Sequence, residues 1–302
     1  MGCTVCGAGS IFTIAVIMKD VLVTGATGFI GNHVIARLLQ LGYNVIASSA
    51  NTAKAAAMPW FSQVRYIPFN FSTFDAATDY FEYFGRPACM IHLAWEGLPN
   101  YKAAFHTEQN LPRHKELLLN MIGNGLADLT VTGTCFEYGR QEGMLNEEME
   151  VHPANPYAIA KNELRIYLQQ LTAEKGVSFK WARLFYMYGK GQNPNSLLSQ
   201  LEKALANGDA AFNMSGGEQV RDFLPVEKVA EYIIAIAMQN RITGVINCCS
   251  GVPVSVNQLI ASYLEKNKKS ILLNRGYYSY PDYEPMRFWG DNAKLKNILN
   301  NE

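Results

Sequence analysis

The sequence predicts a doubly wound α/β fold, with a parallel sheet covered by helices on both faces and a smaller C-terminal lobe. Two observations carry this prediction. Short, β-rich apolar runs alternate with helical patterns through the first two thirds of the chain, and a glycine-rich turn follows the first run. After Gly189 the alternation stops and Gly, Asn, Pro and Tyr become more frequent, as expected for a separate lobe that binds substrate.

The expected elements follow one another in a regular order. Buried strands are predicted at residues 21–23, 44–47, 65–68, 88–93, 129–132 and 179–184, and helices at about 29–41, 74–84, 107–123 and 157–175. We expect a dinucleotide-binding domain over 18–189, with returning segments at about 219–250, and a substrate lobe made mostly of 190–302. Residues 1–17 are interpreted as an N-terminal extension without a chemical role, because Met18 leads directly into the first strand.

Composition excludes several classes of protein. The 302 residues carry a formal net charge of zero, 49% are hydrophobic and 17% charged, which provides ample material for a packed core. Balanced charge argues against a nucleic-acid binder, and no apolar run is long enough for a membrane span. The six scattered cysteines, without a secretory signal, favour a reducing cytoplasm, and the five histidines show no metal-ligand spacing, so we expect no metal.

A glycine triplet between the first strand and the first helix predicts a dinucleotide site. Glycines at this spacing allow a tight turn, close approach of the backbone to a diphosphate, and close helix–strand packing. The anion would then lie on unpaired N–H groups at the start of the helix. The residues expected to contact the cofactor here are Gly25, Thr27, Gly28, Phe29, Ile30 and Gly31.

The second strand indicates which dinucleotide is bound. Sites for NAD usually carry an acid about 20 residues after the glycines, which accepts a hydrogen bond from the ribose 2′-hydroxyl. No Asp or Glu occurs between Asp20 and Asp75, and the strand is followed by Ser48, Ser49 and Lys54. Hydroxyls and a cation suit a 2′-phosphate better than a carboxylate would, so NADPH is favoured and NADH remains possible.

A tyrosine and a lysine one helical turn apart suggest proton transfer. Tyr157 and Lys161 stand at i and i+4 on one helix face, and a fixed ammonium should lower the pKa of a phenol toward neutrality. An exposed helix pair is the structural alternative. Upstream, Thr134 follows the fifth predicted strand, where its hydroxyl could reach a substrate carbonyl.

Together these motifs resemble the extended short-chain dehydrogenase/reductases that act on nucleotide sugars, within the NAD-dependent epimerase/dehydratase family. Further similar segments are 92–94, Asn110 in the following helix, 183–189 and 221–226, so the resemblance spans about residues 19–300. It implies a Rossmann fold, a nucleotide-sugar substrate and a homodimer formed through the helices at about 107–123 and 157–175.

The resemblance also implies roles for individual residues. Tyr157 would be the acid/base, Lys161 its electrostatic partner and a ribose ligand, and Thr134 the hydroxyl that orients the reacting oxygen. Arg221 would clamp the substrate diphosphate, with Arg287 as a weaker second contact. Further cofactor contacts would be Asn70, Phe71, Leu93 and Ala94, and further substrate contacts Tyr186 and Gln192. Asn70 replaces the Asp, and Tyr186 the Asn, that relatives usually carry.

The residues after Thr134 separate the possible reactions. Dehydratases of the family carry Asp-Glu there, whereas this chain has Cys135 and Phe136. The bifunctional enzymes of the fucose pathway place a Cys one position later, and strand alternation should turn Cys135 to the opposite face. We therefore expect a 4-ketoreductase that converts dTDP-4-dehydro-6-deoxyglucose into a dTDP-6-deoxyhexose such as dTDP-fucose, for polysaccharide biosynthesis. A 4-epimerase with tightly bound NAD and a non-catalytic NADP-binding regulator are the alternatives.

Overall fold

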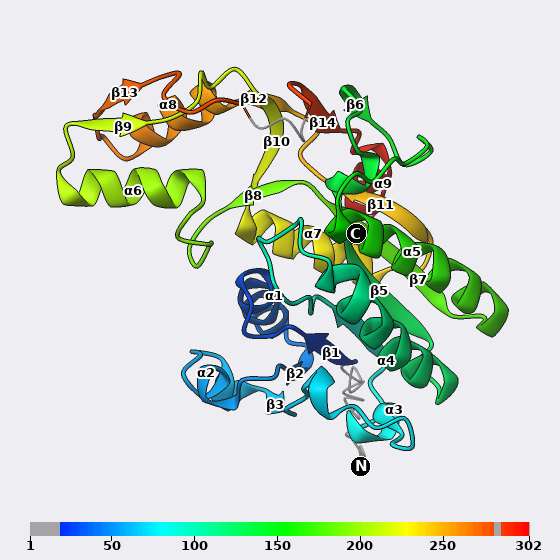
Figure 1. Cartoon of the computed structure of the whole chain (residues 1–302). Coiled ribbons are helices and arrows are strands. Elements are labelled where there is room, and N and C mark those ends of the chain that lie inside the picture. Colours follow the sequence, from blue (N-terminus) through cyan, green and yellow to red (C-terminus); the bar gives the residue numbers. More distant parts are fainter. Residues whose placement is uncertain (1–18, 281–284, 302) are drawn as a thin grey trace, which may run out of the picture.

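A seven-stranded parallel sheet forms the centre of the molecule in the computed structural model, which describes residues 19–280 and 285–301 (Figure 1). The strand order is β11-β7-β5-β4-β1-β2-β3, and every neighbouring pair is parallel. The strands are β1 (Asp20–Thr24), β2 (Asn44–Ser48), β3 (Arg65–Tyr66), β4 (Cys89–His92), β5 (Asp128–Thr134), β7 (Ser178–Leu184) and β11 (Gly244–Cys248). The predicted extension at 1–17 lies outside the described residues.

Helices cover both faces of this sheet, which confirms the doubly wound α/β prediction. Along β1 the side chains alternate, so that Val21 and Val23 join one buried cluster and Leu22 joins the other. The first cluster includes α1 (Phe29–Gln40), α2 (Thr52–Ala56), α7 (Val226–Met238) and α9 (Ala293–Leu299). The second includes α3 (Tyr80–Tyr83), α4 (Leu111–Gly123) and α5 (Pro156–Lys175).

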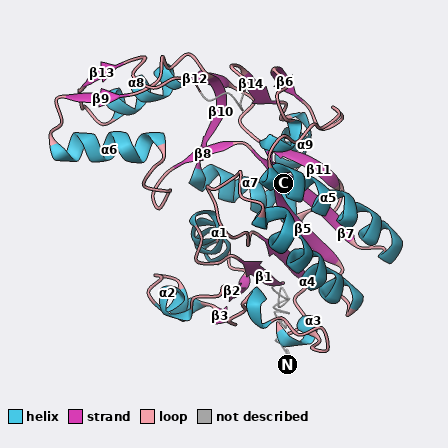
Figure 2. Ribbon diagram, in the orientation of Figure 1, coloured by secondary structure: helices cyan, strands magenta, loops and turns pink. Residues whose placement is uncertain are grey.

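Smaller elements gather beyond the carboxyl ends of the strands. One group, α6 (Leu197–Asn207), α8 (Val256–Lys266), β9 (Ala211–Asn213) and β13 (Leu272–Asn274), has its own apolar cluster and extends away from the large sheet (Figure 2). Strands β8 (Tyr186–Tyr188), β10 (Val220–Pro225) and β12 (Pro253–Ser255) form a three-stranded sheet, and β6 (Gly143–Leu145) pairs with β14 (Phe288–Gly290). Within the described residues, no helix combines the length and apolar character needed to cross a bilayer.

Two predicted elements differ from the structure. The helix expected at 74–84 is limited to Tyr80–Tyr83, because Asp75 accepts hydrogen bonds from residues 77 and 78 in a turn and Asp79 caps the helix that follows. The helix expected from residue 107 begins with a π-helical segment, His106–Asn110, before α4.

Much of the apolar surface on the two helices expected at a dimer interface is buried within the chain. Five of their residues belong to the second cluster, namely Leu117, Leu118, Met121, Leu164 and Leu168. Leu119 and Ile166 on the same two helices are exposed instead.

Candidate active site

The turn between β1 and α1 has a conformation that requires glycine. Gly25 has a φ of +70°, and a Cβ there would stand 2.8 Å from the backbone nitrogen of Ala94. A Cβ on Gly31 would stand 2.2 Å from the carbonyl oxygen of Gly25. The helix begins at Gly28 without a side-chain cap and has no acid in its first turn. Its first N–H groups therefore fit the diphosphate of a dinucleotide.

Two connected clefts open at this turn. The main cleft has a volume of about 450 Å³ and the side cleft about 230 Å³, and both are lined by Gly25, Gly28, Leu93 and Trp95. The predicted residues that line the main cleft are Gly25, Gly28, Phe29, Ile30, Gly31, Leu93, Thr134, Tyr157, Tyr186 and Gln192. Those that line the side cleft are Gly25, Thr27, Gly28, Ser48, Ser49, Lys54, Phe71, Leu93 and Ala94.

The side cleft contains the residues expected near the adenosine half of the cofactor. Ser48 is buried, and the hydroxyls of Ser49 and Tyr66 lie 3.1 Å apart, while Lys54 is exposed at the rim. Asn70, in contrast, is not among the lining residues. Its side-chain oxygen accepts from the backbone and hydroxyl of Ser72, both at 2.9 Å, and caps a short 3-10 turn.

Thr134 and Tyr157 meet at the main cleft. Tyr157 lies in the first turn of α5, whose cap Asn155 accepts from the backbone N–H of Ala158 at 2.9 Å. Thr134 ends β5, and its Oγ1 accepts from the backbone N–H of Phe136 at 3.3 Å. That bond leaves the Thr134 hydroxyl proton to be donated, and this side chain is hydrogen-bonded to Tyr157.

Lys161 stands behind the wall of the cleft. It is 2% exposed, and its Nζ donates to the carbonyl oxygen of Thr132 at 2.9 Å and lies 4.1 Å from the centre of the Trp95 ring. Burial lowers the pKa of Lys161 to about 7, while Glu137 opposes this shift.

The predicted lowering of the Tyr157 pKa is wrong. Burial raises this pKa above its ordinary value, and the hydrogen bond from Thr134 offsets only part of the rise. The physical reason is that desolvation of the phenolate outweighs the nearby cation, because the ammonium of Lys161 faces a carbonyl and an indole ring.

The segment 95–101, between β4 and the π-helical segment, contributes a wall that sequence reasoning missed. Trp95 stacks on His114 with ring centres 4.6 Å apart, and Tyr101 and Tyr157 have ring centres 5.5 Å apart. His114 in turn contacts His92, with their nitrogens 2.7 Å apart. Leu98, Pro99 and Tyr101 line the main cleft together with Trp95.

Phe136 and Cys135 add to the same wall. The rings of Tyr101 and Phe136 meet edge to face at 5.1 Å. Cys135 is buried, as expected, in an apolar cluster with Tyr138 and Phe185, and it is also among the residues that line the main cleft. The segment Cys135–Tyr138 is a 3-10 helix and not a strand, so side chains do not alternate there. Among the described residues that line the main cleft, none is charged.

The two arginines expected at the substrate diphosphate lie outside this lining. Arg221 is 3% exposed, donates from Nη1 to the carbonyls of Val220 and Met286, and stacks 4.5 Å from the Phe288 ring. Its guanidinium is 5.6 Å from the ring of Tyr186, which does line the cleft. Arg287 is exposed beside β10.

Comparisons with known proteins agree with this geometry. Residues 21–249 match the family described as the NAD dependent epimerase/dehydratase family. The chain is 26% identical to a dTDP-6-deoxy-L-talose 4-dehydrogenase (NAD(+)) of Aggregatibacter actinomycetemcomitans, over 90% of this chain and 99% of the relative. It is 25% identical to a GDP-6-deoxy-D-talose 4-dehydrogenase of the same organism, over 93% and 92% of the two chains.

A solved structure of MoeE5 in complex with UDP-glucose and NAD is also similar. Its TM-score is 0.77 at 25% identity, with 93% of this chain and 92% of that chain covered. A UDP-N-acetylglucosamine 4-epimerase from Methanobrevibacter ruminantium M1 has a TM-score of 0.81 at 22% identity, over 93% and 92%, and supports the fold.

Proposed function

Because the chain belongs to the NAD dependent epimerase/dehydratase family, we propose that it is an NAD(P)H-dependent nucleotide-sugar 4-ketoreductase. The substrate proposed is dTDP-4-dehydro-6-deoxyglucose and the product a dTDP-6-deoxyhexose such as dTDP-fucose. One relative is named for dehydrogenation at position 4 of a dTDP-6-deoxyhexose, and reduction of the ketone is that reaction in the opposite direction.

The proposal is supported by Thr134 and Tyr157, which line the main cleft, with Lys161 buried behind its wall. The bound dinucleotide supplies a hydride for carbon 4 of the sugar. Tyr157, a phenol that is protonated at neutral pH, gives its proton to the 4-oxygen. Thr134 donates a hydrogen bond to the same oxygen. The buried Lys161, on the same helix, favours the phenolate that remains.

The uncharged, aromatic wall favours a 6-deoxy sugar. Carbon 6 is two bonds from carbon 4, so it must lie close to the groups around Tyr157. The rings of Tyr101 and Phe136 line the cleft there, and a methyl group can pack against them without giving up a hydrogen bond. The carboxylate of a uronic acid, in contrast, would lack a cation among the described lining residues.

We propose that the enzyme prefers NADPH to NADH, because of the residues that line the side cleft. Ser49 and Lys54 occupy the end of that cleft next to β2, and its acid, Glu96, comes from the segment after β4. A 2′-phosphate could therefore meet a hydroxyl and an ammonium without facing a carboxylate on β2.

The test is an assay of the purified enzyme with dTDP-4-dehydro-6-deoxyglucose and either NADPH or NADH. We expect loss of reduced nicotinamide absorbance and formation of a dTDP-6-deoxyhexose, identified by NMR. Interconversion of UDP-hexoses without net consumption of reduced cofactor would identify an epimerase instead. Nucleotide binding with neither activity would identify a binding protein.

We further propose that the enzyme works as a homodimer in the cytoplasm. The exposed Leu119 on α4 and Ile166 on α5 support this arrangement, since both lie on the helices expected at the interface. The proposed division into a cofactor domain and a substrate lobe is supported by β11 and α7, which return to the large sheet from residues 219–250. Sedimentation of wild type and of Leu119→Glu would test the dimer.

A further inference from the structure

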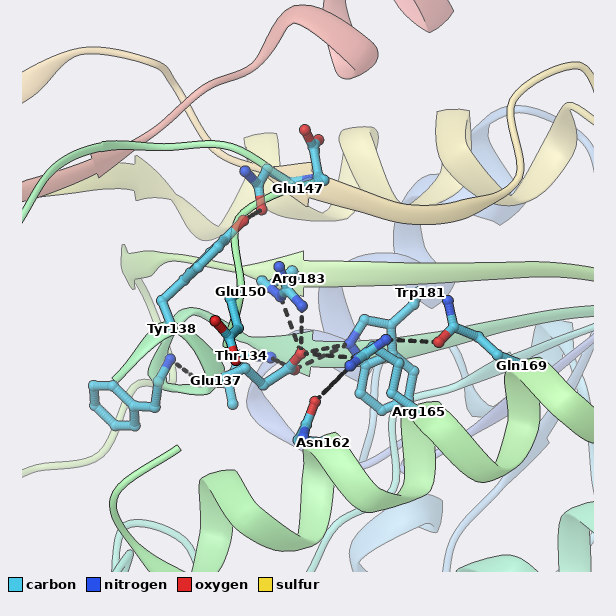
Figure 3. A network of polar contacts seen from close by, with 12 residues as sticks. Thr134, Glu137, Tyr138, Glu147, Glu150, Asn162, Arg165, Gln169, Trp181 and Arg183 are labelled. Atoms are coloured by element: carbon cyan, nitrogen blue, oxygen red, sulfur yellow. Dashed lines mark hydrogen bonds and ion pairs between the residues drawn. The ribbon is translucent and has the colours of Figure 1, made fainter. Parts of the chain in front are cut away.

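A fully buried carboxylate lies directly behind Thr134. Glu137 belongs to the 3-10 turn Cys135–Tyr138 and has no exposed surface. Its Oε1 accepts from the backbone N–H of Thr134 at 2.8 Å and from the indole N–H of Trp181 at 3.0 Å. Its Oε2 accepts from Nε of Arg183 at 3.0 Å and pairs with Nη2 at 2.9 Å (Figure 3). Nε of Arg165 is 3.8 Å from the same oxygen.

These contacts hold Thr134 from both sides. The carboxylate binds the Thr134 backbone while the Thr134 side chain caps the turn that carries Glu137, which is a reciprocal capping box. The packing is tight enough to require glycine at the preceding position. A Cβ on Gly133 would stand 2.0 Å from Nε1 of Trp181 and 2.5 Å from Oε1 of Glu137.

We propose that Glu137 is a positioning residue, which sets where the Thr134 hydroxyl stands relative to Tyr157 and the 4-oxygen of the sugar. This inference rests on the proposed function. Glu137 is not among the residues that line either cleft, so it acts through Thr134 and not on the substrate. It is anchored from β7 through Trp181 and Arg183 and from α5 through Arg165.

Electrostatics supports the same assignment. The negative charge of Glu137 adds to burial in raising the pKa of Tyr157, and it opposes burial in the pKa of Lys161. Glu137 thus favours a protonated phenol and a charged ammonium. The other charged groups that face Glu137 are Arg165 and Arg183, and the groups that face Lys161 include His92, His106 and His114, whose pKa values are all lowered by burial.

A double-mutant cycle between Glu137 and Thr134 tests the proposal. We expect Glu137→Gln to lower kcat by about tenfold or more with little change in KM for the sugar nucleotide, since misplacing one donor to a developing charge acts mainly in the transition state. In a Thr134→Ala background the same substitution should cost less than about twofold, because its effect passes through the missing hydroxyl. The basic limb of the pH–rate profile should also move to lower pH in the Glu137→Gln variant.

A matched control is Asp222→Asn. Asp222 is also fully buried and accepts from backbone N–H groups, of Ser250 at 2.7 Å and Gly251 at 2.8 Å, but it makes no hydrogen bond to Thr134. The effect of Asp222→Asn on the activation free energy derived from kcat should be additive with that of Thr134→Ala. Should Glu137→Gln fail to fold, Trp181→Phe takes its place in the cycle, since it removes one anchor and keeps the carboxylate.

The outcomes separate the two claims. Wild type without turnover overturns the proposed function, and this inference with it. Wild-type turnover with additive costs for Glu137 and Thr134 shows that Glu137 is merely structural and overturns the inference alone. Non-additive costs for Glu137, with additive costs for Asp222, support it.

Discussion

Replacing Lys161 should make the protein more stable while it impairs the proposed reduction. Lys161 is 2% exposed, and burial lowers its pKa from the ordinary 10.5 to about 7. The folded state therefore releases a proton that the unfolded chain still holds between these pH values. At neutral pH the charged side chain opposes folding, and this opposition fades as the pH rises toward 10.5.

The size of the stability change follows from the difference between the pKa of Lys161 in the unfolded chain and in the folded state. With a free energy of about 1.4 kcal/mol per pH unit, the penalty at pH 7 is about 4 kcal/mol. Lys161→Met removes it but also removes the hydrogen bond to Thr132 and the contact with Trp95, worth about 1 kcal/mol each. The variant should thus be about 2 kcal/mol more stable than wild type at pH 7, and no more stable at about pH 9.5.

Urea denaturation of both proteins at the two pH values measures this difference. Comparing the variant with wild type at each pH cancels the contributions of other buried groups, such as Cys89, whose pKa is raised by burial to about 12. A control with Lys54→Met, at an exposed lysine, should change the free energy of unfolding little at pH 7. Equal stability at pH 7, or a gain that persists unchanged at pH 9.5, would refute the reasoning that burial lowers the pKa of Lys161.

Three further substitutions address the acid, the cofactor and the fold. Tyr157→Phe should lower kcat by about 100-fold or more with nucleotide affinity retained in calorimetry, and wild-type turnover in the folded variant would contradict the role of the phenol. Lys54→Ala should lower kcat/KM for NADPH by about tenfold and leave that for NADH within about twofold, whereas equal losses would argue against a 2′-phosphate contact. Asp128→Asn should destabilise the protein by about 3–5 kcal/mol, because Lys180 is fully buried and pairs with Asp128 at 2.5 Å; an unchanged Tm would contradict this.

Local sequence signals predicted the elements that depend on local physics. A strand forms in each of the six predicted places, although the one expected at 65–68 is limited to Arg65–Tyr66, because a parallel strand needs only a short apolar run. The glycine turn was predictable because the close backbone contacts at positions 25 and 31 leave no room for a side chain. Thr134 and Tyr157 were predicted at the cleft from a strand end and a helix start, and the structure places both there.

The segment 95–101 could not be predicted in the same way. It has no hydrophobic period, and its path is set by contacts with distant residues. Asn110 donates to the carbonyl of Glu96 at 3.0 Å, and the His106 ring lies 2.9 Å from the carbonyl of Asn100. The same reason applies to the strand assumed at Cys135: whether the chain continues as a strand or turns after Thr134 depends on the buried Glu137, whose partners come from β7 and α5.

At this site the residues that would contact the substrate are separate from the charged residues. This separation predicts two classes of mutational effect. The described residues that line the main cleft are uncharged, so a substrate would meet hydroxyls, amides and aromatic rings. The charges that set proton affinities lie one layer behind, on Glu137, Lys161 and Arg183, each at most 2% exposed. Charges held in a dry interior need no reorganisation when the reaction begins. Changes in the wall, as at Phe136, should therefore alter which sugar is accepted, whereas changes behind it should alter kcat and its pH dependence.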